Sequence, residues 1–119
     1  MPGLLDVAKA KKEIAAKEMA HIERETALTW GARAAASYEC ALVVEDIHGR
    51  LRCFWEAETY RSEALEHAAM TEDVRFLERL IVEIEGYRSK ARDSLEAERA
   101  GNRRPNRPRA EAEPPAAKP

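Results

Sequence analysis

Proline is missing from almost the whole chain: after Pro2, the next one is Pro105. Average usage of about 5% would place roughly five prolines in such a span. The same interval contains three glycines, Gly31, Gly49 and Gly86. Because these two residue types disrupt helices most strongly, we expect a few long helices with little turn sequence between them.

The composition agrees with one small helical domain. Charged residues make up 35% of the 119 residues, and their signs nearly balance at a net charge of -2. Five of the six prolines fall after Gly101, among arginines, alanines and glutamates. We therefore expect a helical domain over residues 1–100 and a disordered Pro/Arg-rich tail over 101–119.

The spacing of apolar residues predicts an all-α fold built on a long antiparallel hairpin. A first helix from about Leu5 to Glu45 has apolar residues at intervals of three and four, which predicts one buried face that includes Ala15, Met19 and Ile22. The sequence from Ile47 to Arg50 is the best candidate for the reversal. A second helical arm starts near Leu51 and carries a further break signal near Met70.

A break there would divide the hairpin into three helices, the last beginning near Val74. Unbroken arms would be about 65 to 75 Å long, more than a globule of this mass needs. We therefore expect two copies to form a four-helix-type bundle, with a monomeric three-helix bundle broken at Met70 as the alternative. Another alternative is a β-hairpin over residues 38–47 and 51–56, because both segments contain residues that favour strands.

Four aromatic residues, Trp30, Tyr38, Phe54 and Trp55, fall toward the expected turn. Clustered aromatic side chains are typical both of interface hot spots and of ordinary cores. No nucleophile motif or phosphate-binding loop accompanies them. The prediction is a non-catalytic accessory or assembly factor that acts through protein–protein contacts, as a homodimer and with a further protein partner.

A metal site is the second functional hypothesis, with iron or manganese as cofactor. Glu18 and His21 have the Glu-x-x-His spacing of ferritin-like di-metal helices, and Glu63 and His67 form a second pair. The segment Glu-Ala-Leu-Glu-His-Ala-Ala-Met resembles, over about eight residues, the second metal helix of short encapsulated ferritins. Ala64 stands where that family has its metal-binding glutamate.

The expected register limits such a site. In a hairpin that closes at Gly49, His67 would lie level with about residue 31, roughly 15 Å from His21. A di-metal centre would therefore have to be built across two subunits. The same register puts Cys40 about 7 Å beyond the level of Cys53, which disfavours a disulfide between them. It also places His48 at the end of the first helix, where the helix dipole favours a cation.

Basic clusters suggest a third hypothesis, a nucleic-acid-associated accessory protein. The clusters are Lys9, Lys11 and Lys12 near the start, and Arg103, Arg104, Arg107 and Arg109 in the tail. An overall pI near 6.0 makes nucleic acid an unfavoured partner. The first residues lack a secretory signal pattern, and no apolar run approaches the roughly 20 residues of a membrane span, so we expect a cytoplasmic protein without membrane contact.

Overall fold

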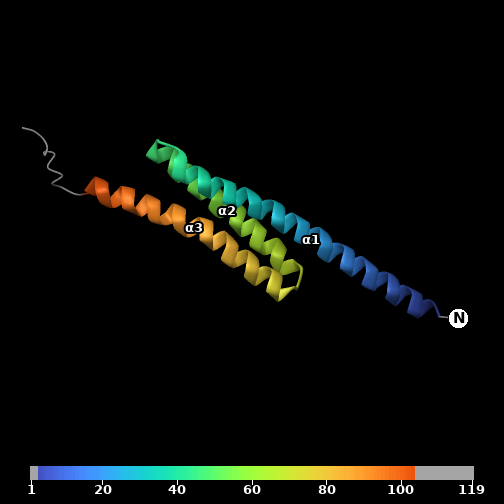
Figure 1. The fold of residues 1–119 in the computed structure, drawn as a ribbon. Helices are drawn as coiled ribbons and strands as arrows, with labels where there is room; N and C mark the ends of the chain where they lie inside the picture. The colour runs from blue at the N-terminus through green and yellow to red at the C-terminus, as the bar shows by residue number, and fades with distance from the viewer. Residues whose placement is uncertain (1–2, 104–119) are drawn as a thin grey trace, which may run out of the picture.

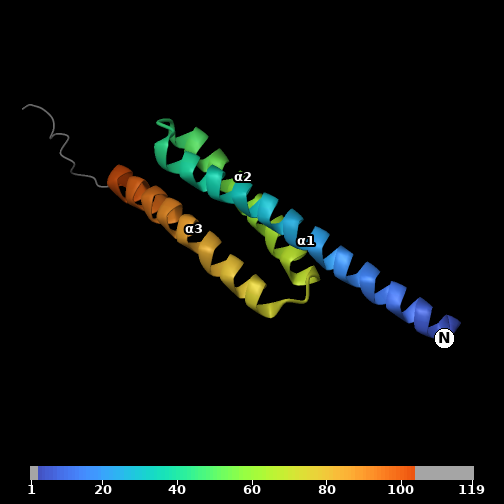
Figure 2. The same cartoon turned by 45° about the vertical axis from the view of Figure 1, so that its right-hand side comes forward.

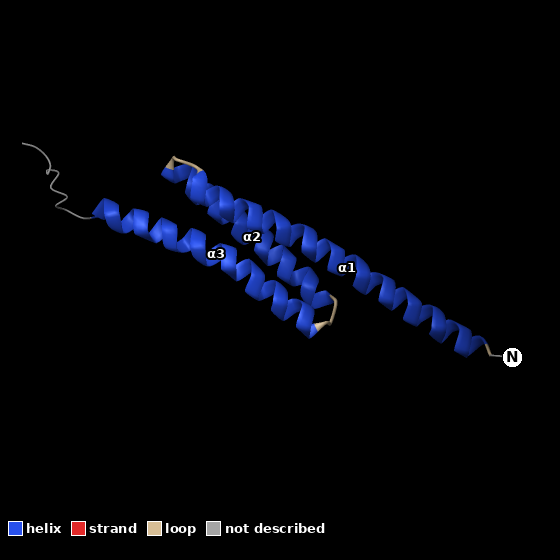
Figure 3. Ribbon diagram, viewed as in Figure 1, coloured by secondary structure: helices blue, strands red, loops and turns tan. Residues whose placement is uncertain are grey.

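The computed structural model describes residues 3–103, and this part of the chain is helical without strands. Three helices follow one another: α1 (Leu4–Val43), α2 (Ile47–Met70) and α3 (Val74–Arg103). They run antiparallel, each beside its neighbour in sequence (Figures 1 and 3). The all-α prediction is confirmed, including the break near Met70, and the alternative β-hairpin over residues 38–56 is wrong.

The helical part of the chain extends slightly beyond residue 100, where we expect the helical domain to end. Helix α3 continues through Gly101 to Arg103, so the first residues assigned to the tail are helical. The remainder of the predicted tail, residues 104–119, lies outside the described residues.

The first reversal lies several residues earlier than predicted. Residues 44–46 form the turn, and the Asp46 side chain caps α2 by accepting a hydrogen bond from the Gly49 backbone N–H at 2.9 Å. Gly49 is therefore inside the first turn of α2 and does not end α1. Its missing side chain leaves room for Val44, since a Cβ there would stand 3.0 Å from Val44 Cγ1. The N-cap of Asp46 thus determines the turn, where we had expected the glycine to do so.

A second capping network separates α2 from α3. The Thr71 hydroxyl donates to the Ala68 carbonyl, and Glu72 takes a positive φ of 60°. The Asp73 carboxylate then accepts a hydrogen bond from the backbone N–H of Phe76 at 3.1 Å. Short polar side chains thus satisfy backbone groups on both sides of the break.

Small residues line the contact between α1 and α2. Ala27, Ala34 and Ala41 recur every seven residues on α1 and are completely buried, as are Ala57 and Ala64 on α2. Side chains of this size let two helix backbones approach closely, at the cost of little apolar area per residue. The larger buried residues come from α3 and from the α1–α2 turn end.

Helix α3 completes the core with Phe76, Leu80 and Ile84. Its Leu80 side chain packs over Gly31 of α1, where an added Cβ would lie 3.4 Å from Leu80 Cδ1. The guanidinium of Arg24 covers the Phe76 ring at 4.4 Å from its centroid. Leu80 thus packs over Gly31 at a distance that would also accommodate a methyl group, so this contact does not require a glycine.

The described residues form a long, narrow rod, since α1 alone, with 40 residues at 1.5 Å each, is about 60 Å long. Helix α1 extends well past the connection between α2 and α3, so its first turns stand alone (Figures 1 and 2). None of the described helices has the length and apolarity needed to cross a lipid bilayer.

Candidate interaction surfaces

The beginning of α1 forms a projecting arm, which we define as residues 4–19. Every residue of this arm is exposed. Leu4 and Leu5 have 89% and 85% of their surface accessible, and Ile14 and Met19 are more than half accessible. The predicted burial of Ala15, Met19 and Ile22 is therefore wrong for this chain on its own. Helix α2 ends before it reaches Ala15, whereas Ile22 stands next to the Glu23 that contacts His67 of α2, and it is exposed because it faces away from α2.

The arm has an apolar stripe of its own on a different side of α1 from the core. With about 100° of rotation per residue, the arm stripe points about 150° away from the core stripe. The arm stripe comprises Leu4, Val7, Ala8, Ile14, Ala15, Met19 and Ile22, and the core stripe Ala27, Gly31, Ala34, Tyr38 and Ala41. In the arm, the positions in line with the core stripe are Leu5, Lys9, Glu13 and Ala16, of which two are charged. The arm stripe thus faces away from the other two helices of its own chain.

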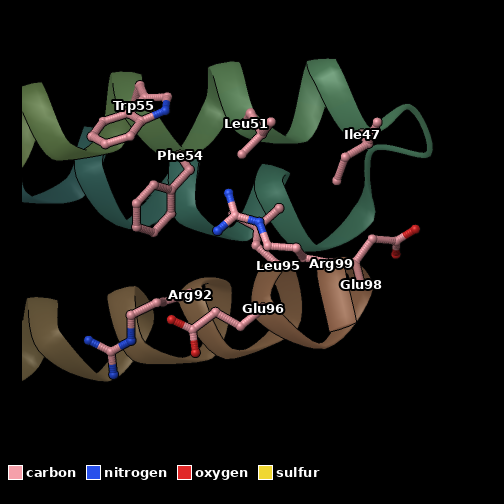
Figure 4. A pocket seen from close by; sticks show the side chains of 9 residues that line it. All are labelled: Ile47, Leu51, Phe54, Trp55, Arg92, Leu95, Glu96, Glu98 and Arg99. Carbon is pink, nitrogen blue, oxygen red and sulfur yellow. The ribbon is translucent and has the colours of Figure 1, made fainter. Parts of the chain in front are cut away.

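A groove between α2 and α3 forms the second candidate surface, near the α1–α2 turn (Figure 4). Its volume is about 460 Å³. Apolar residues cover its floor and charged residues of both signs form its rim. They are Ile47, Leu51, Phe54 and Trp55 from α2, and Arg92, Leu95, Glu96, Glu98 and Arg99 from α3.

Three of the four predicted interface aromatics form a continuous chain of rings. Tyr38 meets Phe54 at 5.6 Å between ring centroids, and Phe54 meets Trp55 at 5.8 Å, both edge to face. Tyr38 is completely buried and Phe54 nearly so, whereas Trp55 is 64% exposed at the groove. Trp30 lies apart and packs on Tyr60. Of these aromatics, Trp55 is therefore the side chain most available to a partner.

The hydroxyl of Tyr38 is an unusual group in this core. It is buried and has no hydrogen-bond partner among the described residues. Burial, followed by the negative charge of Glu58, raises the pKa of Tyr38 well above its ordinary value. The group therefore stays protonated and is unsuited to proton transfer near neutral pH.

The candidate metal residues do not form a metal site in this chain. His67 lies against Glu23, with 2.5 Å between His67 Nδ1 and Glu23 Oε1, and 3.9 Å separates its Nε2 from Glu63 Oε1. Glu18 and His21 are exposed on α1. Within residues 3–103, no three His, Cys, Asp or Glu side chains are arranged to hold a metal ion.

The contact between His67 and Glu23 also corrects the predicted register. We had expected His67 to lie level with about residue 31, about eight residues away along α1. The difference follows from the earlier turn, because moving a reversal shifts every pairing across the hairpin by twice the distance. His48 is likewise corrected: it lies in the first turn of α2, where the helix dipole disfavours a cation, and not at the end of α1.

The same shift brings the two cysteines together. Both thiols are free, Cys40 exposed and Cys53 partly buried. Burial raises the pKa of Cys53, and the neighbouring Cys40 thiol and Glu56 carboxylate add to this effect. The prediction that Cys40 lies about 7 Å along the helix from the level of Cys53 is therefore wrong, because it assumed a later turn.

No pattern in the sequence predicts the structural role of Arg50, whose side chain is buried and only 8% exposed. Its Nε donates to the Ala41 carbonyl oxygen, while its two terminal nitrogens bond to Glu98 Oε1 and Ser94 Oγ. The guanidinium thus ties α2 to both α1 and α3. Fixed donors in a planar fork make arginine suited to such a junction.

Comparison with known proteins gives no relative that would identify this chain: it matches no family model, no curated protein and no solved structure.

Proposed function

We propose that this protein is a helical interaction protein, an accessory or assembly factor without catalytic activity, and that the arm of α1 is its principal contact. The supporting observation is the arm stripe, whose apolar residues lie on the side of α1 opposite the core. A single helix exposes such a stripe to water at a cost in free energy, which a partner helix removes.

A second copy of the chain is the partner we propose for the arm, as a homodimer of coiled-coil type. The arm carries no partner-specific aromatic anchor, and its small and aliphatic residues suit a helix–helix seam. The balanced charge of the chain favours self-association more than attachment to a polyanion. The free cysteines Cys40 and Cys53 agree with the cytoplasmic setting that we propose.

The groove between α2 and α3 is the surface we propose for a different protein. Trp55 projects from it, and exposed tryptophan is among the residues that contribute most to binding energy at interfaces. Since the groove and the arm lie toward opposite ends of the rod, one molecule offers both surfaces at once (Figures 1 and 4).

A pair of matched substitutions tests the role of the arm. Ile14→Asp places a charge in the arm stripe, and Val82→Asp places one on α3 at another exposed apolar side chain. We expect Ile14→Asp to shift the protein from dimer to monomer in size-exclusion chromatography with light scattering, and Val82→Asp to leave the dimer intact. Equal masses for both variants would contradict the proposal.

Elemental analysis of the same chromatographic peak tests the metal hypothesis. The proposed interaction protein carries no stoichiometric iron or manganese. One or two metal ions per chain, lost on His21→Ala, would replace this proposal with the di-metal one.

A further inference from the structure

The arm stripe contains two charged residues in its middle, Lys11 and Glu18. At about 100° per residue they lie within about 20° of each other around α1 and near the centre of the stripe. Both side chains are exposed, and neither forms an ion pair with another described residue. They are spaced by seven residues, so they occupy equivalent positions of successive heptads in an otherwise apolar seam.

We propose that two copies pair through antiparallel arms in the register that sets Lys11 opposite the second copy's Glu18. This inference rests on the proposed self-association and specifies its geometry. The twofold axis then passes between Ile14 and Ala15, so that each ion pair occurs twice. Two apolar pairs match in this register, Val7 with the second copy's Ile22 and Ile14 with the second copy's Ala15, whereas Leu4 meets the second copy's Glu25 and Ala8 meets its His21.

Electrostatics distinguish this register from its neighbours. A parallel pair in register would oppose Lys11 to Lys11 and Glu18 to Glu18. An antiparallel pair centred on Lys11 or on Glu18 would likewise bring identical charges together at the axis. Like charges facing one another in a helical seam are destabilising, and polar residues at seam positions are known to select register. The Lys11–Glu18 arrangement avoids both repulsions.

The fold leaves room for a second helix in this position. The seam from Leu4 to Ile22 is about 27 Å long, at 1.5 Å per residue. Because the stripe points about 150° from the core of the same chain, α2 and α3 lie on the far side of α1 from the incoming arm. The result is an elongated dimer whose two grooves, near Trp55 of each copy, face outward at opposite ends.

Charge reversal tests this register in the full chain. The variants are Lys11→Glu, Glu18→Lys and the double variant Lys11→Glu/Glu18→Lys. Lys9→Glu is the control, because exposed Lys9 lies about 160° around the helix from Lys11. Sedimentation equilibrium at low salt measures the dimer dissociation constant, and circular dichroism reports helicity. We expect each single reversal to raise that constant by about tenfold, since two attractions become two repulsions.

The double variant decides between the register and a general effect of charge. It exchanges the two partners and should return the dissociation constant to within about twofold of the wild type, while Lys9→Glu stays near the wild type throughout. A wild-type dimer whose double variant remains as weak as the single ones would overturn the register and leave self-association standing. A wild-type chain that stays monomeric would overturn both.

Discussion

The Nε of Arg50 donates a hydrogen bond to the carbonyl oxygen of Ala41 at 2.7 Å, across the turn that joins α1 to α2. This carbonyl belongs to the last turn of α1, where backbone acceptors lack partners within the helix. Together with the bonds of Arg50 to Ser94 and Glu98, the contact makes one buried cation the junction of all three helices.

Removing this junction should destabilise the fold. We expect Arg50→Ala to lower the free energy of unfolding by about 2 to 3 kcal/mol, because a buried carbonyl loses its donor and a charged hydrogen bond is lost. Arg52→Ala, at an exposed position two residues away, should change it by less than about 0.5 kcal/mol. Urea denaturation of both variants measures the difference, and similar losses would show that Arg50 is not a special contact.

Gly31 is a place where added volume should help. A Cβ at this position would meet Leu80 Cδ1 at 3.4 Å and Ile84 Cδ1 at 3.7 Å, which are ordinary contacts. Gly31→Ala should therefore raise the free energy of unfolding by about 0.5 to 1 kcal/mol through helix propensity. Gly86→Ala, with nothing within 4 Å of the added Cβ, is the matched control and should give a similar gain. A loss at Gly31 with a gain at Gly86 would mean that α3 packs more tightly than described.

The buried hydroxyl of Tyr38 should contribute nothing to stability. It has no hydrogen-bond partner among the described residues, so Tyr38→Phe removes a desolvated polar group without breaking a bond. Thermal and urea unfolding should show either no change or a gain of about 1 kcal/mol. A loss of more than about 1 kcal/mol would indicate that the hydroxyl is hydrogen-bonded in solution, with Glu58 as the candidate acceptor.

The two thiols should react at different rates. The reactive form is the thiolate, and burial, with a smaller effect of the neighbouring Cys40, raises the pKa of Cys53. At mildly alkaline pH, iodoacetamide should therefore label exposed Cys40 before Cys53, as peptide mass mapping of timed samples would show. The folded state favours the neutral thiol of Cys53. The resulting contribution to the free energy of unfolding is therefore fully present below the pKa that Cys53 has in the unfolded chain, and it is lost as the pH rises through the pKa that Cys53 has in the folded protein. Denatured protein, in which the two rates should become equal, is the control; equal rates in the folded protein would contradict the assigned environments.

Most differences between the sequence-based predictions and the structure follow from one feature, the N-cap of α2 at Asp46, which shifts the pairing of residues along the whole hairpin. The absence of proline and the signal near Met70 were sufficient to predict the three helices, because helix propensity and capping are local. Gly49 was the predicted turn residue, whereas the structure places the turn before it, at the N-cap formed by the Asp46 side chain. That single choice moved His67 to Glu23 and Cys40 to Cys53, positions that no local pattern reports.

The candidate surfaces were predictable in part. The apolar residues of the first helix were visible in the sequence, but Ala15, Met19 and Ile22 were assigned to its buried face, because apolar spacings of three and four drift slowly around a helix. Where α2 ends and which side of α1 it covers decide which apolar residues are buried, and both are tertiary properties. The exposure of Trp55 and the junction at Arg50 likewise depend on how α3 lies against α2.

The mass of the full chain in solution is the most direct test of the central claim, self-association through the arm of α1. Sedimentation equilibrium over about a hundredfold range of concentration would measure it. We predict a reversible dimer, with twice the chain mass of 13.4 kDa at the upper end of the range. A single species of 13.4 kDa at every concentration would contradict the account, because the arm stripe would then remain exposed to water with no second copy to cover it.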